Sequence, residues 1–196
     1  MRIILVMLMS ACLFGLAGCG AKSDTQSGIY NFEAPGNLES KNDLGCISAD
    51  QAKNKYTPTD LYRASSQCVT IGRYKDGVFL FMLAGTYGRF DILRVEDKTA
   101  HQAITVAIME TFWRLDQDKR AAFQESVKAT FGHPENLAAM CREIVRIGPP
   151  DYYPRYMIQH GMRAFNGNTG NGLVKDFDAK AAWQQSLESY AHCPKI

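Results

Sequence analysis

The chain repeats one pattern along most of its length: a residue that favours a helix start, an apolar stripe at helical spacing, and a glycine or proline that favours a stop. The first long copy begins at 57–60 (Thr-Pro-Thr-Asp), where either threonine can cap a helix, and ends at Gly72. Positions i, i+3, i+7 and i+10 of this copy are Leu61, Ala64, Cys68 and Ile71. A stripe of this kind must pack against another element, so the repeated pattern predicts an all-α domain.

Further copies follow, and we expect about six to eight helices in one compact domain. Thr99 and Asp116 open two of them, Gly132 closes the second, and Asp176 or Asp178 opens the last. The helix after Thr99 is apolar on two sides, which predicts a central position in the core. Its apolar residues are Ile104, Val106, Ile108, Met109, Phe112, Trp113 and Leu115.

The segment 78–84 is an unbroken apolar run that fits a buried strand or a buried helix, and its length without alternation favours the helix. With the helix before it, the segment 61–87 resembles a helical hairpin of the tetratricopeptide or Sel1-like type, with Gly72 and Tyr74 at the turn and Ala84 and Gly85 in the second helix. The signature tryptophan, the closing proline and a second copy are absent. The resemblance therefore implies helical-hairpin packing only.

The amino-terminal residues predict export from the cytoplasm. Arg2 precedes an apolar run over residues 3–14 that is too short to span a bilayer as a helix, which is typical of a secretion signal. The run ends in Leu16-Ala17-Gly18-Cys19, which resembles the lipobox of bacterial lipoproteins. The resemblance implies that residues 1–18 are removed and that Cys19 carries acyl chains such as palmitate. An ordinary cleaved signal that contains a cysteine is the alternative.

The same resemblance implies a place in the cell envelope. Gly20 follows the cysteine where aspartate would favour inner-membrane retention in enterobacterial lipoproteins, so we expect the outer membrane, with the protein facing the periplasm. Residues 19–45 are rich in Ser, Asn, Asp, Gly and Lys and predict a flexible tether, and 46–196 should form the helical domain. The acyl chains, and not a spanning helix, would hold the protein on the membrane.

The cysteine count predicts two disulfides. Cys12 leaves with the signal and Cys19 carries lipid, so four cysteines of an exported domain remain. Three pairings are possible. We favour Cys46 with Cys68, which joins the domain start to its first helix, and Cys141 with Cys193, which fixes the chain end; each would contribute about 3 to 4 kcal/mol. A four-cysteine metal site is the alternative, but no C-x2-C pair is present.

Charge and motifs point away from several classes of function. The formal net charge of +2 falls to +1 without Arg2, which gives no electrostatic case for nucleic-acid binding. No nucleophile elbow, Walker loop, dinucleotide fingerprint or H-E-x-x-H motif is present, and we expect no catalytic residue, metal or cofactor beyond the lipid. The four histidines are scattered along the chain; His160 is the one we would test in an enzyme.

The stretch from Pro149 to Arg163 is the most promising for recognition of a partner. Tyrosine and arginine are enriched at protein contacts, and a glycine- and asparagine-rich loop, 166–172, follows. The candidate binding residues are Tyr152, Tyr153, Arg155, Tyr156, His160 and Arg163. The alternative is that the tyrosines only pack over neighbouring helices. One further helix is expected here, holding Met157, Ile158, Met162 and Phe165.

The sequence thus favours a non-catalytic, lipid-anchored module that binds a protein or another envelope component, an immunity-type protein being one version. Two alternatives stay open: an envelope hydrolase or metal-dependent enzyme that uses His160 with acidic residues, and a structural envelope protein.

Overall fold

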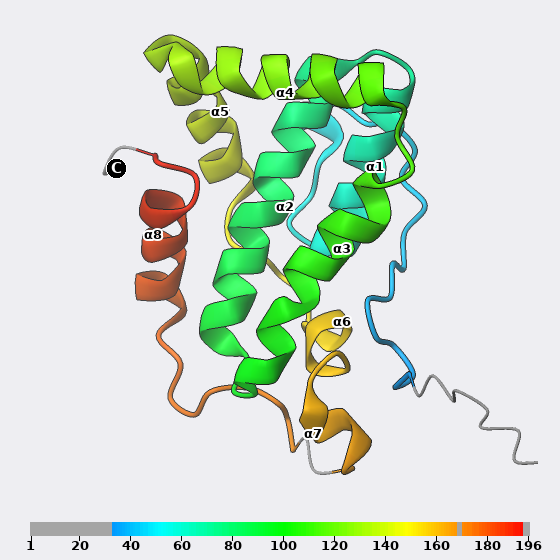
Figure 1. Ribbon diagram of the computed structural model, residues 1–196. Coiled ribbons are helices and arrows are strands. Elements are labelled where there is room, and N and C mark those ends of the chain that lie inside the picture. The colour runs from blue at the N-terminus through cyan, green and yellow to red at the C-terminus, as the bar shows by residue number, and fades with distance from the viewer. Residues whose placement is uncertain (1–32, 168–169, 194–196) are drawn as a thin grey trace, which may run out of the picture. The chain divides into compact units, whose positions relative to one another are not determined.

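A computed structural model of the chain describes residues 33–167 and 170–193, which are all-α as predicted (Figure 1). Eight α-helices and two short 3-10 helices, η1 and η2, follow one another. Their bounds are η1 Ala49–Gln51, α1 Pro58–Thr70, α2 Tyr74–Arg94, η2 Lys98–Gln102, α3 Ala103–Phe112, α4 Gln117–Gly132, α5 Pro134–Ile147, α6 Arg155–Ile158, α7 Met162–Phe165 and α8 Ala179–Ser189. None of the helices in these described ranges is long and apolar enough to span a bilayer.

Helix α2 is the centre of the domain. It packs against α1, α4 and α8 (Figure 1), and most of its residues from Gly77 to Asp91 are buried. The expectation that the helix after Thr99 would be central is wrong, because α3 buries only Ala103, Ile104 and Ala107. On its second apolar side, Val106 is partly buried against the core, whereas Met109 and Trp113 are exposed.

Two glycines let other elements approach α2 closely. A Cβ on Gly85 would overlap the ring and hydroxyl of Tyr190, which follows α8, and a Cβ on Gly88 would collide with the side chain of Ile104 from α3. These two glycines of α2 therefore serve its packing against α3 and the residue that follows α8.

The α1–α2 hairpin begins and turns where the sequence predicts. Thr57 is the N-cap, with its hydroxyl accepting from the Asp60 amide, and Gly72 takes the left-handed conformation (φ +81°) that ends α1. Cys68 is fully buried, as expected. Ile71 departs from its expected stripe: it lies just beyond the helix and is 63% exposed.

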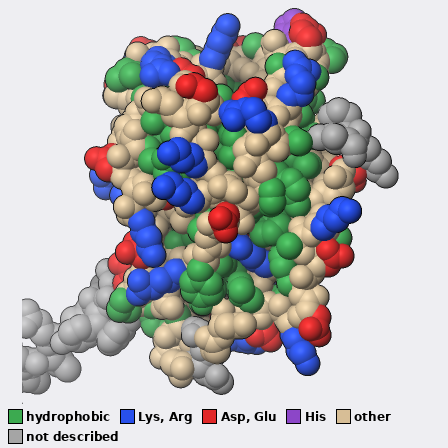
Figure 2. All heavy atoms as spheres, turned by 180° about the vertical axis from the view of Figure 1, so that it is seen from behind, with side chains coloured by type: hydrophobic (Ala, Val, Ile, Leu, Met, Phe, Trp, Pro, Cys, Tyr) green, Lys and Arg blue, Asp and Glu red, His purple; other side chains and the backbone are tan. Residues whose placement is uncertain are grey.

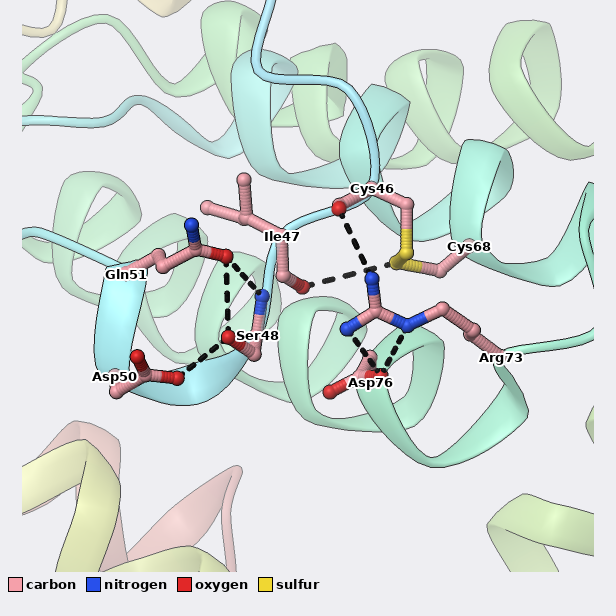
Figure 3. Close-up of polar contacts among 8 residues, drawn as sticks. All are labelled: Cys46, Ile47, Ser48, Asp50, Gln51, Cys68, Arg73 and Asp76. Atoms are coloured by element: carbon pink, nitrogen blue, oxygen red, sulfur yellow. Dashed lines mark hydrogen bonds and ion pairs between the residues drawn. A yellow bond between two sulfur atoms is a disulfide. The ribbon is translucent and has the colours of Figure 1, made fainter.

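Two disulfides close the domain, and the pairs are those that the sequence favoured. Cys46–Cys68 attaches the chain before η1 to the inner face of α1, with Cα atoms 4.6 Å apart, and Cys141–Cys193 attaches the chain end to α5. Beside the first bridge, the Arg73 guanidinium donates to the Cys46 carbonyl at 3.3 Å and pairs with Asp76 at 2.8 Å (Figure 3). Because all four thiols are paired, the four-cysteine metal site is wrong.

The described domain begins at Glu33, so the expected boundary at Cys46 is wrong. Residues 33–45, here called the N-terminal segment, pack on the helices: Leu38 is buried, and its amide donates to the Tyr156 carbonyl at 3.1 Å. The first part of the predicted tether, Cys19 and the predicted signal lie outside the described residues and stay predictions.

The Asp60 carboxylate fixes the N-terminal segment to α1. Besides capping the helix, it accepts from the Ser40 hydroxyl at 2.8 Å and from the backbone amides of Lys41 and Asn42 at 2.8 and 3.0 Å. Burial alone would raise the pKa of Asp60, but these hydrogen bonds outweigh it and hold the pKa below its usual value. Ser40 and Asn42, which we expected in a flexible tether, therefore donate hydrogen bonds to the buried Asp60 carboxylate.

Candidate functional site

Two of the predicted binding residues, Tyr152 and Tyr156, lie inside the domain and not on a surface patch. Their hydroxyls donate to the same oxygen of Asp91, at 2.9 and 2.7 Å. Burial raises the pKa of both tyrosines far above its usual value. The alternative interpretation, that these tyrosines pack against neighbouring helices, is the correct one for both.

Asp91 is a buried carboxylate that interacts with three side chains, those of Arg94, Tyr152 and Tyr156. Its second oxygen accepts from Arg94 Nε and pairs with Arg94 Nη2, both at 2.7 Å, and the guanidinium lies 5.1 Å from the ring centres of Phe90 and Tyr152. Burial raises the pKa of Asp91, and Arg94 and the two tyrosine hydroxyls oppose that rise. The Asp91 side chain is fully buried and its oxygens are occupied by these donors, so the cluster holds α2 to the 152–156 stretch and offers no route to a substrate.

Arg155 and His160 are occupied with the N-terminal segment. Arg155 donates to the Pro35 carbonyl at 3.1 Å and lies 3.5 Å from a Glu39 oxygen, and His160 Nδ1 lies 2.8 Å from the Asn37 side chain. Burial lowers the pKa of His160, which favours its neutral form. No group of three or more His, Cys, Asp or Glu side chains in the described part of the chain is placed to hold a metal ion.

Tyr153 and Arg163 are the two predicted residues that stay largely exposed, and both have intramolecular partners. The Tyr153 hydroxyl donates to the Asn171 carbonyl at 2.9 Å, and Arg163 pairs with Glu96 at 2.6 Å. The six predicted residues therefore do not form one recognition patch. The expected single helix around them is also wrong: it is two four-residue helices, α6 and α7.

The outward side of α3 exposes large apolar side chains, which the predicted patch does not do as a group. Met109 is 61% exposed and Trp113, the residue that ends the helix, is 80% exposed. The two positions are i and i+4, so they lie on one side of α3. At this end of α3, Arg120 of α4 donates to the Trp113 carbonyl at 3.3 Å.

An open polar groove of about 370 Å³ lies between α1 and α3, and its lining includes Glu110 and Arg114, which follow Met109 and Trp113 in the sequence. A hydrogen bond from the Ser66 hydroxyl to the Thr111 carbonyl, 3.3 Å, crosses its floor. Arg63 and Arg114 line the groove, and no described carboxylate lies within 4 Å of either guanidinium. We call Met109, Trp113, Arg63 and Arg114 the α3 face. In the sequence, the α3 face is indicated by the second apolar side of the helix after Thr99, which predicts burial in the core.

A second groove, of about 300 Å³, lies where α4 and α5 meet the start of α2. Val78, Phe79 and Met140 form its apolar part, and Lys75, Ser126 and Asn136 are at its rim. Elsewhere the surface is mixed: Figure 2, which shows the side hidden in Figure 1, has apolar side chains among scattered lysines, arginines and acidic residues.

Comparison of the chain with protein-family models, with curated proteins and with solved structures gave no match. The site therefore has to be interpreted from its own chemistry.

Proposed function

We propose that this chain is a lipid-anchored envelope protein, attached through Cys19 to the outer membrane and facing the periplasm, that binds a partner protein without catalysis. The observation that carries the binding role is the exposure of Trp113, which is 80% exposed at the end of α3, one helical turn from the exposed Met109. The lipobox resemblance at Leu16–Cys19 and the two disulfides support the location, since disulfides persist in oxidising compartments.

The chemistry of the α3 face suggests the partner's surface. Tryptophan and arginine dominate binding energy at protein contacts because they combine large area with directed hydrogen bonds. Trp113 needs an apolar pocket, and the two arginines of the neighbouring groove, Arg63 and Arg114, outnumber its one carboxylate, Glu110, and favour carboxylates on the partner. The partner surface that fits is therefore a hydrophobic pocket with an acidic rim.

Affinity capture from chemically crosslinked envelopes tests the binding role. Wild type, Trp113→Ala, a double variant Arg63→Ala/Arg114→Ala and a control, Val174→Ala, are compared. Val174 is also exposed and apolar, at 39%, but belongs to the other end of the molecule, where its amide bonds to Arg94 at the end of α2. We expect one protein to be captured by wild type and by the control and lost from both α3 variants. The same capture from all four proteins overturns the proposal.

Anchoring is tested separately. Labelled palmitate should appear on wild type and not on Cys19→Ser, and the mature protein should begin at Cys19 by mass spectrometry. An intact 196-residue chain without label would overturn the anchored part of the proposal.

A further inference from the structure

Helix α7 presents two apolar side chains to solvent. Met162 is 61% exposed and Phe165 is 48% exposed, and the positions i and i+3 lie on one side of the helix. Unlike the exposed pair Met109 and Trp113, these two belong to an element that contributes no fully buried side chain. The helix therefore has little role in the core.

The backbone of α7 is nevertheless held firmly. The Met162 amide donates to the Thr99 hydroxyl at 2.8 Å, and the Arg163 amide donates to Asp97 at 3.0 Å. Gly161, just before the helix, is so close to Asp97 that a Cβ there would overlap the carboxylate. Because these bonds fix α7 to η2, the two apolar side chains point outward from a rigid support.

The same end of the molecule is where the chain leaves toward Cys19. Pro35 and Asn37 of the N-terminal segment bond to Arg155 and His160, so the segment runs along α6, next to α7 (Figure 1). Thirteen residues, 20–32, separate Glu33 from Cys19. At about 3.6 Å per residue they span at most ~50 Å, which sets an upper limit on the distance between Glu33 and any lipid attached to Cys19.

We infer that Met162 and Phe165 insert into the surface of the bilayer that holds the lipid anchor. This inference rests on the proposed lipidation of Cys19. Two side chains would bind a membrane weakly from solution, but the anchor makes their contact intramolecular and so raises its effective concentration. The bilayer contact orients the domain: α7 faces the lipid, while α4 and the end of α3, at the opposite end in Figure 1, face away from the membrane.

Fluorescence quenching by brominated lipid tests the orientation. The full-length lipoprotein and its Phe165→Trp variant, purified from membranes, are reconstituted into phosphatidylcholine nanodiscs with and without bromine on the acyl chains. Phe165 is half exposed, so an indole fits there without disturbing the core. We expect at least a twofold loss of the fluorescence that the new tryptophan adds. The parent protein, which carries Trp113 and Trp183, should change by less than a tenth.

Three outcomes overturn the inference in distinguishable ways. If the variant co-migrates with the discs but is not quenched, the bilayer contact is wrong and the anchor stands. If the parent protein is quenched and Trp113→Phe removes that quenching, the α3 face lies on the membrane instead. If neither protein carries acyl chains or co-migrates with discs, the proposed anchoring fails and the inference fails with it. Amide exchange gives an independent test. We expect residues 162–166 to exchange more slowly in wild type bound to discs than in Cys19→Ser in solution.

Discussion

The α3 face and the stretch from Tyr152 to His160 both contain aromatic residues and arginines, but they differ in how far these side chains are buried and paired. In the stretch, each tyrosine hydroxyl and the arginine have defined partners, and the rings are mostly covered. On the α3 face, Trp113 stands in solvent and two arginines have no described carboxylate within 4 Å. An aromatic residue indicates recognition only when its surface and polar atoms are still unpaired. By that criterion the α3 face is the stronger candidate.

The largest expected effect comes from removing the buried charge that holds the Tyr152–His160 stretch. Asp91→Ala leaves Arg94 and two tyrosine hydroxyls without their acceptor, so the free energy of unfolding should fall by about 3–5 kcal/mol. Urea unfolding followed by circular dichroism measures it. Asp118→Ala, in the exposed first turn of α4, serves as the control and should change stability by less than about 0.5 kcal/mol. A loss below about 1 kcal/mol at Asp91 would show that the cluster is not a structural clamp.

On the α3 face the expected effect is on binding alone. Trp113→Ala should weaken partner binding by about 2 kcal/mol, roughly 30-fold, because the indole is the central contact. The free energy of unfolding should change by no more than about 0.5 kcal/mol, because the side chain is 80% exposed. Calorimetric titration with the captured partner and urea unfolding give the two numbers. If Trp113→Ala binds the partner normally but unfolds more easily, Trp113 has a role in stability and not in binding.

Tyr153 and Tyr156 allow an exposed and a buried hydroxyl of the same stretch to be compared. Tyr156→Phe should cost about 1–2 kcal/mol of stability, since it removes a buried 2.7 Å bond to Asp91. Tyr153→Phe loses an exposed bond to Asn171 and should cost less than about 0.5 kcal/mol. Both variants are compared by thermal and urea unfolding. Equal costs would mean that burial does not separate the two hydroxyls.

The smallest expected effect concerns Asp60, whose bonds keep the N-terminal segment over the Tyr152–His160 stretch. Its pKa in the folded protein lies below that of an unfolded aspartate, about 3.9, so its contribution is present above that pH and is lost as the pH falls through the lower folded pKa. We expect a loss of about 1 kcal/mol below pH ~3.9.

Asp60→Asn should remove this acid dependence. Amide exchange at Lys41 and Asn42 reports the release of the segment locally, and unfolding measured from about pH 5 to pH 2.5 reports it globally. Wild type and Asp60→Asn with the same acid dependence would contradict the role assigned to this carboxylate.

Several local patterns gave correct predictions, but the expected helix start at Thr99 is wrong: Thr99 lies within η2, which Asp97 caps, and α3 begins at Ala103. The Thr57 cap, the stop at Gly72 and the Asp178 cap, which accepts from the Ala181 amide, depend on hydrogen bonds within a few residues. The apolar run 78–84 is helical, as expected, and its helix extends without a break from Tyr74 to Arg94. The pairing of Cys46 with Cys68 needed only an inward-facing position on α1 next to the start of the domain.

The errors concern which side of an element is covered. The sequence showed that the helix after Thr99 is apolar on two sides, but it could not show that α2, and not α3, takes the centre, nor that nothing described covers Met109 and Trp113. The short polar side chains of 40–42 are equally suited to a solvated tether and to hydrogen bonds with a carboxylate. Only the position of Asp60 beside them decides between these alternatives.

By itself the sequence determined the all-α class and the positions of several helix ends, and it favoured one pairing of the cysteines, because capping, periodicity and chain connectivity are local or countable properties. The tertiary structure alone decided that Asp91 gathers Arg94, Tyr152 and Tyr156 from distant positions, and that the indole of Trp113 stays in water. Burial is a property of whatever packs against a side chain, and those neighbours come from elsewhere in the chain.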